Sequence, residues 1–135
     1  MSDECLFCRI LTGQIPSKRV YEDEFCIGFL DIAPFHCGHT VIIPRRHVAD
    51  GTQDPQSWHE LANGIVAVAQ LVKDKLGATG ANILSNAGEV SGQSVFHFHV
   101  HVIPRYDDNP GMSGLARHDG TAPAKLEETW ALLTA

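Results

Sequence analysis

The segment HFHVH holds the densest group of reactive side chains in this sequence. Side chains alternate between the two faces of a β-strand, so His97, His99 and His101 are expected on one face. Phe98 and Val100 then face the core. Neighbouring histidines on a flat strand lie about 7 Å apart, too far for all of them to share one small ion. The pattern therefore favours a row of separate contacts along one ligand over an exposed polar face.

A metal site is a second possibility. Histidine is the commonest metal ligand, and Cys5-x-x-Cys8 supplies half of a tetrahedral zinc site. Cys26 and Cys37 are isolated in the sequence, and a lone cysteine in an apolar stretch, such as Cys26, is typical of a buried thiol. The missing ligands of a zinc site would then be histidines. Two alternatives stay open: packed thiols at Cys5 and Cys8, and a catalytic metal on the HFHVH histidines.

Composition limits the kind of partner. The 135 residues include 10 Lys and Arg against 16 Asp and Glu, a formal net charge of −6. This balance argues against binding to a nucleic acid polymer but allows a small phosphorylated ligand in a local pocket. We find no apolar run of about 18 residues, so no membrane span is expected. The N-terminus does not resemble a signal peptide, and we expect a cytoplasmic protein with reduced cysteines.

Periodicity and turn residues predict an α+β fold. Asp54 and Pro55 are typical of a helix start, and Gly77 of a helix end. Between them an apolar stripe recurs at helical spacing, comprising Leu61, Ile65, Val68, Val72 and Leu76. Other expected elements are a short helix at 5–12, strands at 18–23, 25–31, 39–44, 81–86 and 94–104, the last stopped by Pro104, and a helix at 125–133. Short connections favour an antiparallel sheet of about five strands with the long helix packed across it.

Three blocks of the chain resemble one known family. HFHVHVI at 97–103 fits the H-x-H-x-H-x-x signature of the histidine triad (HIT) superfamily, in which x is hydrophobic. CLFCRILTGQIPSKRVYEDE and FLDIAPFHCGHTVIIPRRH resemble its N-terminal and central blocks, and SNAGEVSGQSVFHFHVHVIPR its active-site block. The resemblance covers about residues 5–106 and implies the HIT-like fold in a single domain spanning 1–135, with a less characteristic tail at 107–135.

The resemblance implies a homodimeric enzyme that hydrolyses or transfers at the α-phosphate of a nucleoside phosphate, with a purine nucleotide or a related derivative as its partner. By position, His99 resembles the nucleophile that forms a nucleotidyl-histidine intermediate. His101 resembles the histidine on the leaving-group side, and His39 the histidine that lines the same phosphate site. Neutral imidazole suits this role because it is nucleophilic near pH 7 and also leaves readily in the second step.

The same resemblance assigns binding residues. Gln93 and Ser94 match residues that hydrogen-bond phosphate oxygens, while Asp31 and Asn86 match positions near the ribose. An apolar base pocket is implied at Leu6, Phe7, Phe29 and Ile32. Ordinary core packing is the alternative for these apolar residues, most of all for Phe29 and Ile32. For Asp31 the alternative is an acid that caps the turn before Ala33 and Pro34.

The resemblance also completes the zinc site. In branches that carry the N-terminal C-x-x-C pair, a histidine after the I-P-x-x-H block and the first triad histidine join the cysteines. Here these are Cys5, Cys8, His47 and His97. A closed Cys₂His₂ set implies one structural zinc per chain, and it makes His97 a ligand, not a catalyst.

The C-terminal tail departs from the ending of the Hint branch and is more similar to bacterial HIT-like proteins. Neither the phosphoramidates of Hint nor the dinucleoside polyphosphates of Fhit can therefore be assigned as the substrate. A protein that binds or senses a purine nucleotide without turnover remains the alternative function.

Overall fold

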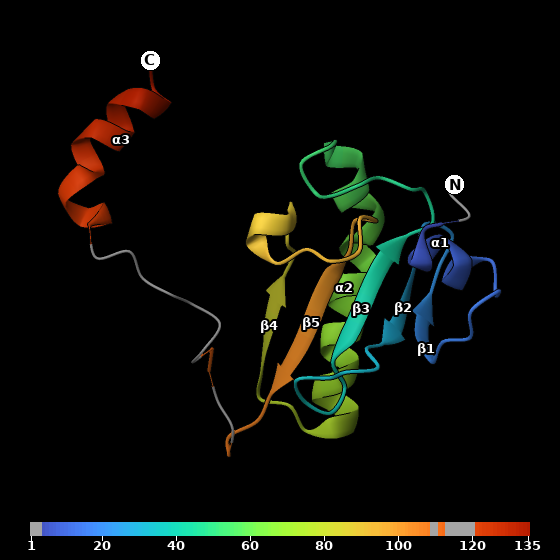
Figure 1. Cartoon of the computed structure of the whole chain (residues 1–135). Coiled ribbons are helices and arrows are strands. Elements are labelled where there is room, and N and C mark those ends of the chain that lie inside the picture. The colour runs from blue at the N-terminus through green and yellow to red at the C-terminus, as the bar shows by residue number, and fades with distance from the viewer. Residues whose placement is uncertain (1–3, 109–110, 113–120) are drawn as a thin grey trace.

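Five antiparallel strands form one sheet in the order β1-β2-β3-β5-β4, which confirms the predicted α+β fold (Figure 1). The computed structural model describes residues 4–108, 111–112 and 121–135. The strands are β1 (Arg19–Glu22), β2 (Cys26–Leu30), β3 (Thr40–Pro44), β4 (Gly80–Leu84) and β5 (Val100–Arg105). The helices are α1 (Leu6–Leu11), α2 (Pro55–Leu76), η1 (Glu89–Ser91), η2 (Ala122–Lys125) and α3 (Leu126–Leu133).

The long helix α2 covers one face of the sheet. Its start and end match the prediction: Asp54 accepts a hydrogen bond from the Ser57 N–H, and Gly77 closes the helix at φ 75°. Leu61, Val68 and Val72 of the predicted stripe are buried. Leu76, the last residue of the stripe, is 49% exposed because the helix ends there, beyond most of the sheet.

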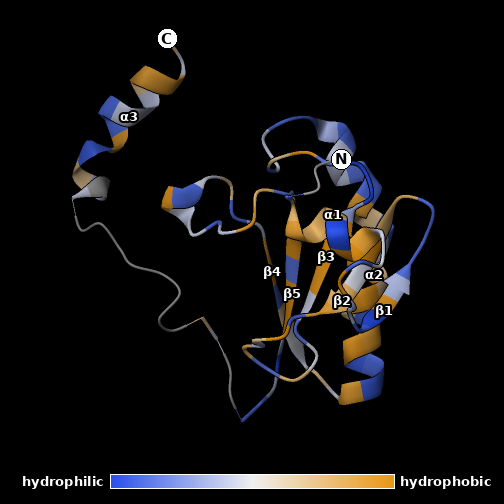
Figure 2. Cartoon of the chain, turned by 45° about the vertical axis from the view of Figure 1, so that its right-hand side comes forward, coloured by the Kyte–Doolittle hydropathy of each residue, from blue (hydrophilic) through white to orange (hydrophobic). Residues whose placement is uncertain are grey.

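The opposite face of the sheet carries α1 and a second apolar cluster (Figure 2). Its buried members are Phe7, Ile10, Ile27, Phe29, Val41 and Ile43. Cys5 caps α1, because its sulfur accepts the Cys8 N–H. The N-terminal segment therefore packs beside the end of the sheet where the histidines lie, and it leaves part of that face uncovered.

The histidine strand is shorter than predicted. β5 begins at Val100, so His97 and His99 precede it, and it runs through Pro104 to Arg105. Pro104 does not stop the strand, because β3 pairs with β5 only as far as Val102, and beyond that point Pro104 pairs with β4 alone. The predicted alternation of faces still holds. Phe98, Val100 and Val102 lie in the core against α2, and His101 pairs with Val41 of the opposite cluster.

The C-terminal segment ends in α3, the predicted short helix, which stands apart from the sheet (Figure 1). The expected loop before α3 includes the short helix η2, and much of the tail, with His118, lies outside the described residues. Within the described residues, α2 is the longest helix, and neither it nor any other is apolar enough over sufficient length to cross a membrane.

Gly64 allows α2 to approach the sheet closely. A Cβ atom at this position would lie 2.8 Å from the Cys26 sulfur and 3.2 Å from a ring carbon of Tyr21. We predict that Gly64→Ala lowers the free energy of unfolding by about 1–3 kcal/mol through overpacking, although alanine favours a helix by about 1 kcal/mol. The measurement is urea unfolding at fixed protein and zinc concentrations.

The matched control is Asn63→Ala, at the exposed neighbouring helical position. Alanine at position 63 adds no atoms to the core and favours the helix. We therefore expect the free energy of unfolding to stay unchanged or to rise slightly. If Gly64→Ala stabilises the protein as much as Asn63→Ala, close packing at Gly64 is not what holds α2 against the sheet.

Candidate active site and metal site

Four side chains from three separate segments meet at the N-terminal end of α1. The ligand atoms of Cys5, Cys8, His47 and His97 all lie within 4.8 Å of one another. The Cys8 sulfur is 3.3 Å from Nδ1 of His47 and 3.5 Å from Nδ1 of His97. Zinc with tetrahedral sulfur and nitrogen ligands sets these atoms about 3.3–3.8 Å apart. The four residues are thus positioned to bind a metal.

The tautomer of His97 fits the same conclusion. Its Nε2 lies 2.9 Å from the carbonyl oxygen of Pro44, which can only accept, so Nε2 carries the proton. Burial lowers the pKa of His97 to about 4, and the ring is neutral at pH 7. Nδ1 therefore presents a lone pair, 3.1 Å from Nδ1 of His47. Nδ1 of His97 and Nδ1 of His47 thus lie beside two sulfurs, which is a donor set that suits zinc.

His99 is held in the opposite tautomer. Its Nδ1 lies 2.7 Å from the carbonyl oxygen of His97, so Nδ1 carries the proton and Nε2 keeps its lone pair. The side chain is only 6% exposed, and burial lowers its pKa, which keeps the imidazole neutral at pH 7. The ring of Phe7 packs edge-on against His99 with centroids 5.0 Å apart. Position, tautomer and charge together leave Nε2 free to act as a nucleophile.

A second polar cluster lies beside His99. The rings of His99 and His101 have centroids 5.0 Å apart, closer than the flat-strand spacing suggests. Nε2 of His39 is 2.9 Å from Nδ1 of His101 and 3.6 Å from Oδ2 of Asp31. Burial lowers the pKa of His101 to about 4 and also lowers that of His39. Two neutral imidazoles and one carboxylate thus lie together beside His99.

Asp31 serves the turn as well as the cluster. Its Oδ1 accepts a hydrogen bond from the Ala33 N–H, as the capping alternative predicts. Its Oδ2 faces His39. The two interpretations of this residue are compatible, because each uses a different carboxylate oxygen.

The loop before the histidines is held by Gln93. This buried side chain accepts the Gly88 N–H through Oε1, and its Nε2 donates to the carbonyl oxygens of Ala49 and Val95. Both amide hydrogens are thus used within the chain, and the side chain shapes the loop. Ser94 is exposed.

The same loop brings Asn86 beside Gly92. The Asn86 side-chain amide lies 3.6 Å from the position of a Gly92 Cβ. Gly92 has a φ of 107°, a conformation that L side chains rarely adopt. The amide of Asn86 is therefore set against the loop at a point where only a glycine fits without strain.

The predicted base-pocket residues divide into two groups. Phe7 and Phe29 are buried and pack against each other with ring centroids 5.6 Å apart. Leu6 is 42% exposed and Ile32 is fully exposed. Of these four residues, only Leu6 and Ile32 offer substantial apolar surface to a ligand, while Phe7 packs between Phe29 and the rings of His97 and His99.

Some groups of the site carry no signal in the sequence. The Ser85 hydroxyl donates to the carbonyl oxygen of His99 at 2.6 Å, and the Phe35 ring stacks on His39 with centroids 5.6 Å apart. The carbonyl groups of Pro44 and His97, which fix the histidine tautomers, belong to the backbone. A motif of side-chain types cannot reveal them.

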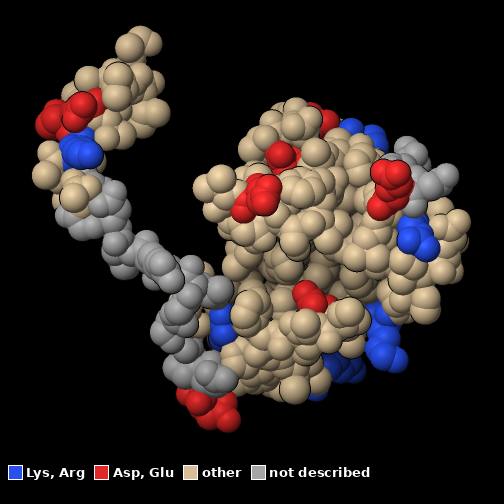
Figure 3. All heavy atoms as spheres, viewed as in Figure 1, with Lys and Arg blue, Asp and Glu red and all other residues tan. Residues whose placement is uncertain are grey.

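Charge is scattered over the face of the molecule that carries α1. Lys and Arg side chains form no continuous basic patch there, and Asp and Glu side chains lie among them (Figure 3). The described part of this face therefore offers no extended cationic surface of the kind that attracts a polyanion.

Comparison of the sequence with known proteins finds the same family. The HIT domain model matches residues 12–108. Protein hit of Bacillus subtilis is 38% identical over 115 residues, which cover 84% of this chain and 79% of that protein. Adenylylsulfatase HINT3 of Arabidopsis thaliana is 33% identical over 106 residues, which cover 78% of this chain and 54% of that protein.

Solved structures share the fold. A HIT family protein from Bacillus anthracis superimposes with a TM-score of 0.85 at 36% identity, covering 99% of this chain and 95% of that one. A zinc-bound histidine triad family protein from Mycobacterium smegmatis does so with a TM-score of 0.68 at 37% identity, covering 93% and 97%. Sequence, fold and the arrangement of the histidines agree, and the chain belongs to the histidine triad (HIT) family.

Proposed function

We propose that this protein hydrolyses or transfers at the α-phosphate of a purine nucleoside phosphate derivative through a nucleotidyl-His99 intermediate. The observation that carries the proposal is the 2.7 Å contact between Nδ1 of His99 and the His97 carbonyl oxygen. This contact commits the other ring nitrogen, Nε2, to the unprotonated form that a nucleophile needs. Burial of the ring keeps it neutral without help from a neighbouring base.

The reaction proceeds in two balanced steps. Nε2 of His99 attacks the α-phosphorus; a P–N bond forms, and the bond to the leaving group breaks with its electron pair on the leaving atom. Water then attacks phosphorus, the P–N bond returns its pair to Nε2, and the proton from water passes to solvent. The Nδ1–H to His97 remains in place throughout and stabilises the positive charge that develops on the ring.

The remaining residues bind the substrate or position the groups that do so in this proposal. His101 lies on the leaving-group side, and His39 supports the phosphate site through His101, since the His39 ring packs against His101 and the His101 ring packs against His99. Asp31 and Asn86 contact the ribose end, and Ser94 adds a phosphate donor. Gln93 acts indirectly by holding the loop. Leu6 and Ile32 provide the exposed apolar surface for the base.

Candidate substrates follow from the chemistry of the leaving group. One relative is an adenylylsulfatase, so adenosine 5′-phosphosulfate belongs in a substrate panel with an adenosine phosphoramidate and a diadenosine polyphosphate. All present the same adenylyl group to His99 and differ only in what departs. The panel therefore tests the reaction class before the physiological substrate is known.

We predict that His99→Gly lowers kcat/KM by at least about 10³-fold on every panel substrate that the wild type turns over, because the nucleophile is lost. Added imidazole is expected to restore part of the rate by occupying the vacated space. The control is His59→Ala, at an exposed position on α2, which is expected to retain wild-type activity.

Two results would oppose the enzymatic proposal. If the wild type binds AMP tightly yet turns over nothing in the panel, the protein is a nucleotide-binding or sensing module. If His99→Gly has the same kcat/KM as the wild type, a group other than His99 attacks the phosphorus.

We propose that the metal is zinc, one per chain, with a structural role. The Cys₂His₂ set is closed, so it leaves no ligand position open for water or substrate. One structural neighbour is zinc-bound. The bound ion would link α1, the segment after β3 and the segment before β5, and would hold His97 in place beside His99.

We predict that Cys5→Ser abolishes zinc binding and lowers the free energy of unfolding by about 3 kcal/mol when zinc exceeds its dissociation constant a hundredfold. Serine is a good helix N-cap, so this substitution removes the metal ligand while preserving the cap of α1. The measurements are metal content by mass spectrometry and urea unfolding. Cys37→Ser, an exposed cysteine outside the cluster, is the control.

A zinc content near one per chain in Cys37→Ser and near zero in Cys5→Ser supports the assignment. Retention of a full zinc equivalent by Cys5→Ser would show that the metal binds elsewhere.

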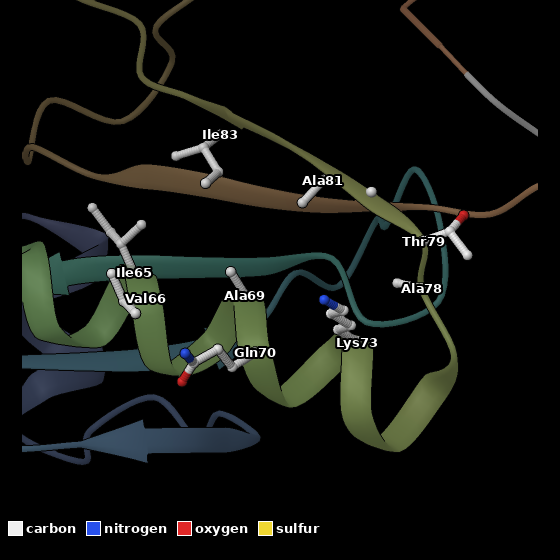
Figure 4. A pocket seen from close by; sticks show the side chains of 10 residues that line it. Ile65, Val66, Ala69, Gln70, Lys73, Ala78, Thr79, Ala81 and Ile83 are labelled. Carbon is white, nitrogen blue, oxygen red and sulfur yellow. The ribbon is translucent and has the colours of Figure 1, made fainter.

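We propose that two copies of the chain associate through the edge strand β4 and the adjoining surface of α2. The two elements enclose an open groove of about 370 Å³ (Figure 4). Ile83 of β4 and Val66 of α2 are 51% and 56% exposed there. β4 is paired on one side only, and an unpaired strand edge with an apolar flank suits a two-fold symmetric contact.

We predict that Val66→Asp converts the dimer into a monomer at micromolar concentration. In a two-fold contact the new carboxylates of both copies would be buried close together without a cation to pair with, which is unfavourable. Sedimentation velocity measures the outcome. Val90→Asp, a fully exposed position on η1, is the matched control and is expected to remain dimeric. A monomeric wild type, or a dimeric Val66→Asp variant, would contradict this interface.

A further inference from the structure

A chain of three groups connects the turn after β2 to the last triad histidine. The Phe35 backbone N–H donates to Nδ1 of His39 at 3.1 Å. On the other side of the same ring, Nε2 of His39 lies 2.9 Å from Nδ1 of His101. His39 is 1% exposed, so both of its nitrogen atoms are satisfied within the protein and not by solvent.

The backbone amide decides which nitrogen of His39 carries the proton. An amide N–H can only donate, so Nδ1 of His39 must present its lone pair. A neutral His39 then carries its proton on Nε2, and burial favours the neutral ring. Nε2–H donates to Nδ1 of His101, which in turn must carry its own proton on Nε2.

Asp31 does not compete for this proton but favours its position. Its Oδ2 is 3.6 Å from Nε2 of His39, beyond the 2.9 Å of the His101 contact, and its negative charge stabilises an N–H on that side. The same argument bears on metal binding by Asp31, His39 and His101, whose ligand atoms lie within 4.8 Å of one another. A protonated Nε2 on His39 offers no lone pair to a metal, so this cluster is suited to hydrogen bonding.

We propose that the Phe35 backbone amide and His39 are positioning groups that hold His101 as an Nε2–H donor directed at the leaving group. The inference rests on the proposed function of the site and deepens it. His39 in this scheme does not touch the substrate; it acts through His101. No hydrogen bond from Nε2 of His101 to the rest of the described chain is found, so this N–H is available to a ligand.

If His101 acts in this way, the loss of kcat/KM that follows removal of its support depends on the leaving group. When the bond to phosphorus breaks, its electron pair passes to the leaving oxygen, and the His101 N–H stabilises the charge that accumulates there without transferring its proton. A poor leaving group accumulates more charge and needs the donor more. The phenyl and p-nitrophenyl esters of AMP have similar shapes and differ mainly in this property.

The first experiment reads the tautomers directly. Nitrogen-15 NMR of the zinc-loaded wild type at pH 7 is expected to show His39 and His101 with the proton on Nε2. Phe35→Ala retains the backbone N–H and is expected to preserve both tautomers. Phe35→Pro removes it and is expected to admit the Nδ1–H form of His39. Finding Nδ1–H on either histidine of the wild type overturns the proposal.

The second experiment is kinetic and uses a matched pair at His39. Glutamine places an N–H donor near the position of Nε2, whereas methionine fills similar space and donates nothing. His39→Met is expected to lower kcat/KM for the phenyl ester by about 100-fold and for the p-nitrophenyl ester by less than about tenfold. His39→Gln is expected to stay much closer to the wild type on both esters.

These readouts separate the two proposals. Equal losses on the two esters in His39→Met would reduce His39 to a packing role and overturn the positioning inference, while turnover through His99 would stand. If the wild type cleaves neither ester nor any substrate of the adenylyl panel, the proposed function and the leaving-group role of His101 fail together. Turnover of a panel substrate with neither ester cleaved overturns the leaving-group role of His101 alone. The NMR result still decides whether the Phe35 amide sets the tautomers.

Discussion

The hydrogen bond from Nδ1 of His99 to the carbonyl oxygen of His97 is the contact on which the rest of the site depends. It determines which nitrogen of His99 keeps its lone pair, and it ties that nitrogen to the position of His97. His97 is in turn fixed at both ring nitrogens, by the Pro44 carbonyl oxygen on one side and by the cysteine cluster on the other. A disturbance of the Cys5, Cys8, His47 and His97 cluster therefore reaches the His99 ring through a single residue, His97.

The framework around this contact is rigid for identifiable reasons. Between His97 and His99, Phe98 is fully buried against Trp58, and its backbone N–H donates to the Val48 carbonyl oxygen at 2.7 Å. The Ser85 hydroxyl, one residue beyond the end of β4, donates to the His99 carbonyl oxygen. Alternation along the segment thus serves two purposes: the apolar residues anchor it to the α2 side, and the histidines face the opposite side with fixed tautomers.

Much of this arrangement was predictable from the sequence, because periodicity and turn chemistry are local. Asp54 and Gly77 mark α2, and the spacing of the histidines indicates their common face. The start of β5 at Val100 was not predictable, since it depends on where β3 ends its pairing. Likewise, the internal hydrogen bonds of Gln93 and the contact of the Phe35 amide with His39 join side chains to backbone groups, and the Gln93 contact with Ala49 spans 44 residues of sequence. Side-chain identity alone does not encode them.

The three triad histidines are chemically distinct in the proposed function although they are identical in sequence: His97 holds its lone pair toward the cysteines, His99 toward the substrate, and His101 presents a proton. The most direct test of the proposed nucleotidyl-His99 intermediate is rapid quenching of the wild-type protein during turnover, followed by mass spectrometry of its peptides under alkaline denaturing conditions. We predict a nucleoside monophosphate adduct on His99, formed and consumed at rates compatible with kcat. Turnover with no adduct at His99, or with the adduct on another residue, would contradict it.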